Sequence, residues 1–278
     1  MNSQDITRAL IDTTVARAMV EMDADPKRSV RKLCDLGRQF SRGRFQNQIF
    51  AIFQDLLRND ESPYYQAIDF LLRSNDPEAL RQFGINIGYN SFTYGAQILR
   101  QKQKELSFAV PWVVKLRLDS RIPDTYDSSF FASVVRTGLT YGIYSYQLRS
   151  MDHHEDMESY LAVIQSHPEC AFLWFLSDTP LTEKQQKLLL SCPNLMVSLP
   201  IDAPSTASMA KALRRQKTLF GMHKVYQDAD AAAYLLSFDH LYSQMEQSVF
   251  FFLVADDSCS KESIRETSFK CYGACCDS

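Results

Sequence analysis

Apolar positions in the first hundred residues recur at helical spacing. Val30, Leu33 and Phe40 fall on one helical stripe, and Ile52 and Leu56 belong to a second. Three junctions place a side-chain acceptor at an N-cap and a proline at the first helical position: Asp25-Pro26, Ser62-Pro63 and Asp76-Pro77. The pattern therefore predicts an all-helical domain over residues 1–110. Its predicted helices span residues 4–22, 26–41, 44–59, 63–74, 77–87 and 91–105.

After Pro111 short β-rich runs alternate with helical segments. The predicted strands are 113–118, 142–148, 170–176, 194–200, 218–225 and 248–255, and the predicted helices between them are 129–141, 157–168, 182–192, 205–216 and 229–245. Alternating strands and helices predict parallel βα units, and apolar strands without clean alternation suit a sheet covered on both faces. We therefore expect an α/β fold, in which residues 111–256 form a partial (β/α)6 TIM-like barrel of parallel strands.

Two further stretches have an expected character of their own. Residues 257–278 form a polar, cysteine-containing tail that we expect to be disordered, because it has little core-forming power. The glycines of FGINIGYNSFTYGAQ follow a predicted helix rather than a strand, so they do not form a phosphate-binding loop. We expect them to form a tight corner between two helices.

Composition adds exclusions rather than a function. The chain has 278 residues, 45% of them hydrophobic and 23% charged, which is typical of a soluble globular protein with a real core. Its net charge of −3 creates no field for nucleic acid or an anionic membrane, and the apolar run VFFFLVA is too short to cross a bilayer. Seven cysteines, an odd number, favour free thiols in a reducing compartment. We therefore expect a cytoplasmic protein that binds neither nucleic acid nor membrane.

Five phrases carry a resemblance to a known family. In chain order they are DPKRSVRKLCDLGRQFSRGRFQNQIFAIFQDLL, FGINIGYNSFTYGAQILRQKQKELSFAVPWVVKLRLD, TGLTYGIYSY, HPECAFLWFLSDTPLTEKQQKLL and LMVSLPIDAP. In their sequences and in their order along the chain, these segments resemble the helical N-terminal domain and barrel of a group of radical S-adenosylmethionine (radical SAM) proteins, over most of residues 20–255. Enzymes of that family carry a CxxxCxxC loop after the first barrel strand, whose three thiolates hold a [4Fe–4S] cluster with one iron open to S-adenosylmethionine.

The defining motifs of that family are missing here. The matching loop reads DSRIPDTYDSSF, and no cysteine occurs between Cys34 and Cys170. Asp, Ser, Tyr and Arg side chains do not replace three soft thiolates on iron. The family carries Gly-Gly-Glu after the second strand. The matching positions of this chain are Ser150, Met151 and Asp152, and the resemblance implies that the methionine would crowd the cofactor. The resemblance thus implies a pseudoenzyme, without cofactor, that acts as a binding or scaffolding partner.

Two alternatives remain open. The first is an active radical SAM-type enzyme whose cluster is non-canonical or donated by a partner, with Cys271, Cys275 and Cys276 as candidate metal ligands in the tail. The second is a cluster-independent protein that binds S-adenosylmethionine, an amino acid or a peptide in a mixed acidic and basic pocket at the strand ends. The candidate pocket residues are Asp119, Arg149, Asp152, Ser177, Asp178, Asp202, His223 and Lys224, with Asp256 beside them.

Two surface features complete the expectations. His153 and His154 stand among carboxylates in RSMDHHED, which could bind a divalent metal but reads more simply as the solvated start of a helix. The apolar run VFFFLVA is expected at an uncovered edge of the barrel. That edge is a natural surface for a protein or peptide partner, such as an active paralogue.

Overall fold

The computed structural model describes residues 3–22, 25–41, 44–118, 127–151, 156–227, 248 and 250–267. Its amino-terminal part is helical. The helices are α1 (Ser3–Glu21), α2 (Pro26–Phe40), α3 (Arg44–Leu56), α4 (Tyr64–Ser74), α5 (Pro77–Ile85), the π-helix η1 (Asn86–Gly95) and α6 (Ala96–Leu106). Among the described residues no helix is long and apolar enough to cross a membrane.

The proline junctions start two of these helices as predicted. Asp25 accepts a hydrogen bond from the backbone nitrogen of Arg28, and Asp76 accepts one from that of Ala79, so both cap helices that begin with proline. The third prediction is wrong in detail, because α4 begins after Pro63 and has no side-chain cap.

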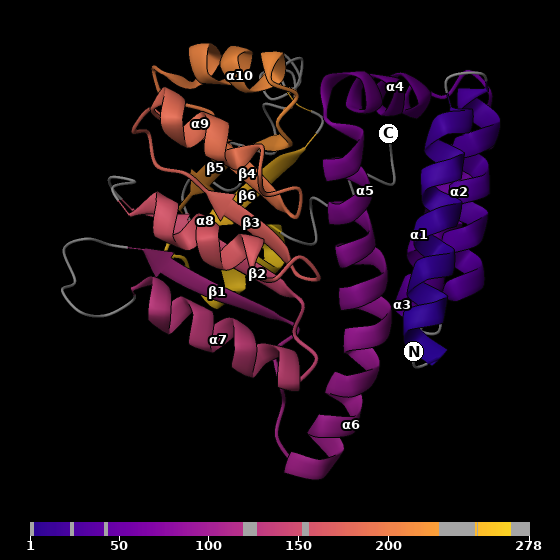
Figure 1. Ribbon diagram of the computed structural model, residues 1–278, viewed down its shortest axis with the longest axis horizontal. Coiled ribbons are helices and arrows are strands. Elements are labelled where there is room, and N and C mark those ends of the chain that lie inside the picture. Colours follow the sequence, from indigo (N-terminus) through magenta and orange to yellow (C-terminus); the bar gives the residue numbers. More distant parts are fainter. Residues whose placement is uncertain are drawn as a thin grey trace.

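The predicted corner between helices at residues 84–95 is also wrong. Helix α5, η1 and α6 follow one another without a break and form one long column beside the sheet (Figure 1). A polar side chain of η1 is held by the loop that leads into β3: Nδ2 of Asn86 donates to the carbonyl oxygens of Pro168 and Cys170, each at 2.8 Å. These tertiary hydrogen bonds keep the segment helical despite its glycines.

Six parallel strands form one sheet in the order β1-β2-β3-β4-β5-β6. They are β1 (Val113–Leu118), β2 (Ser145–Ser150), β3 (Ala171–Phe175), β4 (Leu195–Pro200), β5 (Phe220–Tyr226) and β6 (Phe251–Ala255). Helices α7 (Ser128–Thr140), α8 (Met157–Gln165), α9 (Glu183–Leu189) and α10 (Thr206–Arg215) lie along one face (Figure 1). The expected α/β class with parallel strands is confirmed as a helical region plus a curled six-stranded half-barrel. The helix predicted at 229–245 lies outside the described residues.

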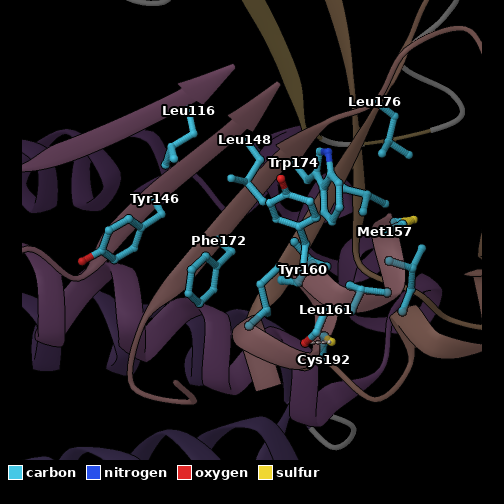
Figure 2. Close-up of a cluster of buried hydrophobic side chains, with 14 of the residues drawn as sticks. Leu116, Tyr146, Leu148, Met157, Tyr160, Leu161, Phe172, Trp174, Leu176 and Cys192 are labelled. Atoms are coloured by element: carbon cyan, nitrogen blue, oxygen red, sulfur yellow. Dashed lines mark hydrogen bonds between the residues drawn. The ribbon is translucent and has the colours of Figure 1, made fainter. Parts of the chain in front are cut away.

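Large side chains fill the space between the sheet and helices α7 to α9. Phe131 of α7 packs against Phe172 of β3, and Tyr160 of α8 packs against Trp174, with ring centroids 5.9 Å apart in both pairs. Figure 2 shows strand and helix side chains meeting in this layer. The main core therefore lies on the outer face of the curled sheet.

The inner face has a different lining. Towards the amino-terminal ends of the strands, Ala79, Leu80 and Phe83 of α5 pack against Met196 and Leu219. Farther along, the rings of Phe175 and Phe252 are 5.7 Å apart, although they belong to β3 and β6, which are not neighbours in the sheet. This contact across the interior requires the curl of the sheet. Helix α5 thus covers one end of the interior, and the carboxyl ends of the strands form the other.

Only the first part of the polar tail is among the described residues. Residues 261–267 form a helix after β6, and the rest of the tail, with Cys271, Cys275 and Cys276, lies outside the described residues.

Candidate functional site

The predicted pocket residues lie on or directly after four strands, at the carboxyl end of the sheet. Arg149 is on β2, and His223 and Lys224 are on β5, whereas Ser177, Asp178 and Asp202 follow β3 and β4. Asp119 and Asp152, together with His153 and His154, lie outside the described residues. The structure divides the remaining candidates into two groups and two separate residues.

The first group centres on Arg149, whose side chain is largely buried. It faces Arg117 across the β1–β2 pairing, so two like charges are neighbours on the inner face. The acidic residues after β6 balance them: Arg117 forms an ion pair with Asp257, and Arg149 lies 3.9 Å from carboxylate oxygens of both Asp256 and Asp257. The guanidinium also donates to the carbonyl oxygen of Ala255 at 3.4 Å. These contacts join the first two strands to the end of the last one.

His223 extends this group into the interior. Its ring is 4% exposed, its Nδ1 lies 3.0 Å from Oγ of Ser198, and it packs edge-on against Phe175 at 5.3 Å between centroids. Burial, and secondarily the positive charge of Arg149, lower the pKa of His223 to about 4, against a smaller opposing effect of Ser198. The imidazole is therefore neutral at pH 7 and presents hydrogen-bonding nitrogens rather than a charge.

A second group joins the ends of β4 and β5. Nζ of Lys224 forms an ion pair with a carboxylate oxygen of Asp202, and the aspartate is the more exposed partner. The pair lies at the exposed rim of the strand ends, and an exposed ion pair of this kind contributes little to stability. For the other two candidates the recorded contacts are local ones: Oγ of Ser177 accepts from the backbone nitrogen of Thr179, and the carbonyl oxygen of Asp178 accepts from Oγ of Ser205.

Of the positions that resemble Gly-Gly-Glu, Ser150 faces the outer core, and Asp152 lies outside the described residues. Oγ of Ser150 accepts a hydrogen bond from Nε1 of Trp174 at 2.9 Å, and Trp174 belongs to the core under the outer helices. The backbone nitrogen of Met151 continues the strand pairing by donating to the carbonyl oxygen of Leu118. This segment is therefore part of the packed sheet at its first two positions.

Three of the four described cysteines have surroundings that do not suit an iron–sulfur ligand. Cys34 lies on α2, whereas Cys170 and Cys192 lie in loops before β3 and β4. Burial raises the pKa of Cys34 and of Cys192 to about 11 and also raises that of Cys170. Thiols in such surroundings stay protonated, whereas iron needs thiolates. Cys259 alone of the described cysteines is at the strand ends, where it donates to the carbonyl oxygen of Tyr226. Within the described part of the chain, no three His, Cys, Asp or Glu side chains are placed to hold a metal ion.

Sequence reasoning missed three members of the Arg149 group. Arg117 and Asp257 come from opposite edges of the sheet, so only the curl makes them partners. Ser198 had a detectable signal, because it is the one polar residue within the apolar strand LMVSLP. A buried polar residue at such a position needs a partner on the same face.

Comparisons with known proteins leave this geometry to stand by itself. No protein-family model, no curated protein and no solved structure matches the chain.

Proposed function

We propose that this chain is a cytoplasmic pseudoenzyme of radical SAM type, with a truncated TIM-like barrel, which acts by binding or scaffolding a partner. The observation that carries the proposal is the loop DSRIPDTYDSSF, which follows β1 directly and contains no cysteine. The described cysteines support it, since only Cys259 is at this end of the sheet and one thiol cannot replace three.

The surface that would meet a protein or peptide partner is the edge of β6 that faces away from β5. Its five residues, FFLVA, are all half-buried, and among the described strands only β5 pairs with it. An apolar edge strand with unpaired backbone groups is a template for another strand. A partner strand added there would extend the half-barrel in the direction in which it is incomplete.

Anaerobic reconstitution with iron and sulfide tests the absence of the cluster. We expect far less than one [4Fe–4S] cluster per chain after desalting and no visible absorption band of the kind that such clusters give. We also expect no cleavage of S-adenosylmethionine under reducing conditions. A stoichiometric cluster that cleaves S-adenosylmethionine would overturn the proposal. The variant Cys259→Ser, reconstituted in parallel, would then show whether the tail supplies ligands.

A specific observation favours a second candidate function, the binding of a small zwitterion at the strand ends. Among the described residues, the carboxylates nearest Arg149 are 3.9 Å away, which is beyond hydrogen-bonding distance, so a ligand carboxylate could approach the guanidinium while Asp256 and Asp257 attract its ammonium group. Calorimetric titration with S-adenosylmethionine, S-adenosylhomocysteine and methionine tests this function. We expect micromolar binding that Arg149→Met weakens at least tenfold and that Arg215→Met, a change of the same type on the exposed end of α10, leaves unaltered. The absence of binding by the unmodified chain would exclude it.

A further inference from the structure

A large cavity lies within the helical region, away from the strand ends. Its volume is about 590 Å³, and its walls come from helices α1 to α5, from η1 and from the amino-terminal part of the sheet's inner face. Ile11 and Val15 of α1 form part of one wall, and Met196 and Leu219 form the end against the sheet. The volume falls within the range of small-molecule binding sites, and the lining is almost entirely apolar.

Two glycines leave the cavity open along α5 and η1. Gly84 and Gly88 are one helical turn apart and both line the cavity, and a Cβ atom added at either would meet no atom within 4 Å. Glycine weakens a helix, so two of them on one face are costly unless the space they leave is used. Here they extend the cavity up to the helix backbone.

The cavity is partly open to solvent, so its apolar walls remain exposed to water when no ligand is bound. An apolar molecule that enters it would remove this surface from water, which is favourable in proportion to the apolar area covered. Water itself binds weakly there, because ordered water needs several polar partners and the walls offer few. The lining therefore favours an apolar occupant.

The polar groups at the cavity define the charge of the occupant. Arg81 is the one charged side chain among the described residues that line it, and it forms ion pairs with both Asp12 and Glu78. Its charge is thus already more than balanced, so it offers no free cation to an acidic ligand. A charged ligand would lose its hydration in this cavity without gaining a partner of opposite charge. A neutral molecule avoids this desolvation cost, because it carries no charge.

We propose that this cavity binds an elongated, uncharged apolar molecule, such as an aliphatic alcohol or the neutral chain of a lipid. The inference goes beyond the proposed function, because the cavity lies at the opposite end of the sheet from Arg149 and His223. It stands whether or not the strand ends bind a ligand or a cluster.

Titration of the full chain with the neutral fluorophore N-phenyl-1-naphthylamine tests the proposal. We expect saturable fluorescence enhancement at one probe per chain, displacement by 1-dodecanol, and displacement by dodecanoate only at concentrations at least tenfold higher. Gly84→Leu and Gly88→Leu fill the cavity from α5 and η1, and Val15→Phe fills it from α1. Each should weaken probe binding at least tenfold without changing the far-UV circular dichroism spectrum.

The variant Lys104→Leu is the matched control, because it adds the same side chain to an exposed position of α6, outside the cavity lining. It should bind the probe like the unmodified chain. The proposal is overturned if the unmodified chain shows no saturable binding, or if the folded filling variants bind as well as it does. A concentration-dependent dimer that Gly84→Leu dissociates would also overturn it, in favour of a second copy as the occupant.

Discussion

Nδ1 of His223 on β5 lies 3.0 Å from Oγ of Ser198 on β4, inside the curled sheet. The pair is enclosed, since His223 is 4% exposed and Ser198 is fully buried. Burial and the nearby guanidinium of Arg149 both favour the neutral imidazole. His223 thus remains uncharged beside the guanidinium of Arg149.

The first prediction is an acid sensitivity caused by His223. Its pKa is about 4 in the folded protein and about 6.5 when unfolded, so the unfolded state binds the proton more tightly. The stability that depends on the neutral ring is complete above pH 6.5 and is lost as the pH falls towards 4. The shift corresponds to about 3 kcal/mol in the free energy of unfolding.

Urea denaturation followed by circular dichroism between pH 7.5 and 4 measures this effect. In His223→Gln, whose side chain does not titrate, the loss of stability over this range should be smaller by about 3 kcal/mol. The compared quantity is the change in the free energy of unfolding with pH, so any cost of the substitution that is independent of pH cancels. Parallel curves for the two proteins would contradict the prediction.

The second prediction concerns the coupling between Arg149 and His223. Arg149→Met removes the cation that lowers the pKa of His223, and so the pKa should rise above 4 but stay below 6.5, because burial is the larger cause. Proton–carbon NMR of the imidazole Cε1 resonance, assigned with His223→Gln, measures this pKa. Arg117→Met is the control, since Arg117 does not contribute to the shift. An unchanged pKa in Arg149→Met would show that the charge is screened.

Much of the fold was predictable because it is encoded locally. The β1 prediction matches the strand Val113–Leu118, since VVKLRL combines β-branched residues with breakers on both sides. The helical column α5–η1–α6 was not predictable, because its glycines read as breaks while the residues that hold it, Asn86 and Asn90, bond to backbone groups about eighty positions away. Local propensity cannot report such distant partners.

The candidate site divides in the same way. Arg149 and His223 were predictable, because polar residues at the carboxyl ends of parallel strands converge. The ion pair between Arg117 and Asp257 was not predictable, because it depends on the curl of the sheet. The curl brings Asp257, at one edge of the sheet, close to Arg117 at the other. The cavity had no sequence signal at all, since Gly84 and Gly88 were interpreted as a turn.

The third prediction tests how η1 is fixed to the sheet. Asn86 is fully buried, its Nδ2 donates to two carbonyl oxygens and its Oδ1 accepts from Nδ2 of Asn90. Asn86→Asp keeps the shape but replaces the donor with a charged acceptor that faces the carbonyl oxygens of Pro168 and Cys170. We expect a loss of about 3–5 kcal/mol at pH 7, as for an uncompensated buried charge.

Asn86→Ala separates charge from lost hydrogen bonds. It should cost about 1–3 kcal/mol, the penalty for leaving buried acceptors unpaired. Burial should raise the pKa of the introduced carboxyl, so Asn86→Asp should recover part of its stability when the pH is lowered to 5, whereas Asn86→Ala should not. Urea denaturation at both pH values decides. If the two variants are equally stable at pH 7, the carbonyl groups do not face this side chain.

The fourth prediction compares two glycines of the same helical column. A Cβ atom at Gly95 would lie 2.4 Å from the carbonyl oxygen of Gly142 and 2.8 Å from that of Asn90, so two backbone segments would have to separate. At Gly84 the same atom meets nothing within 4 Å. Gly95→Ala should therefore lower the free energy of unfolding by about 1–3 kcal/mol through overpacking. Gly84→Ala should raise it by about 0.5–1 kcal/mol through helix propensity.

Both substitutions add one methyl group to a helix, so the difference between them, measured by urea denaturation, isolates the contact between η1 and the turn before β2. Equal effects in the two variants would mean that this contact does not hold the helical column against the sheet.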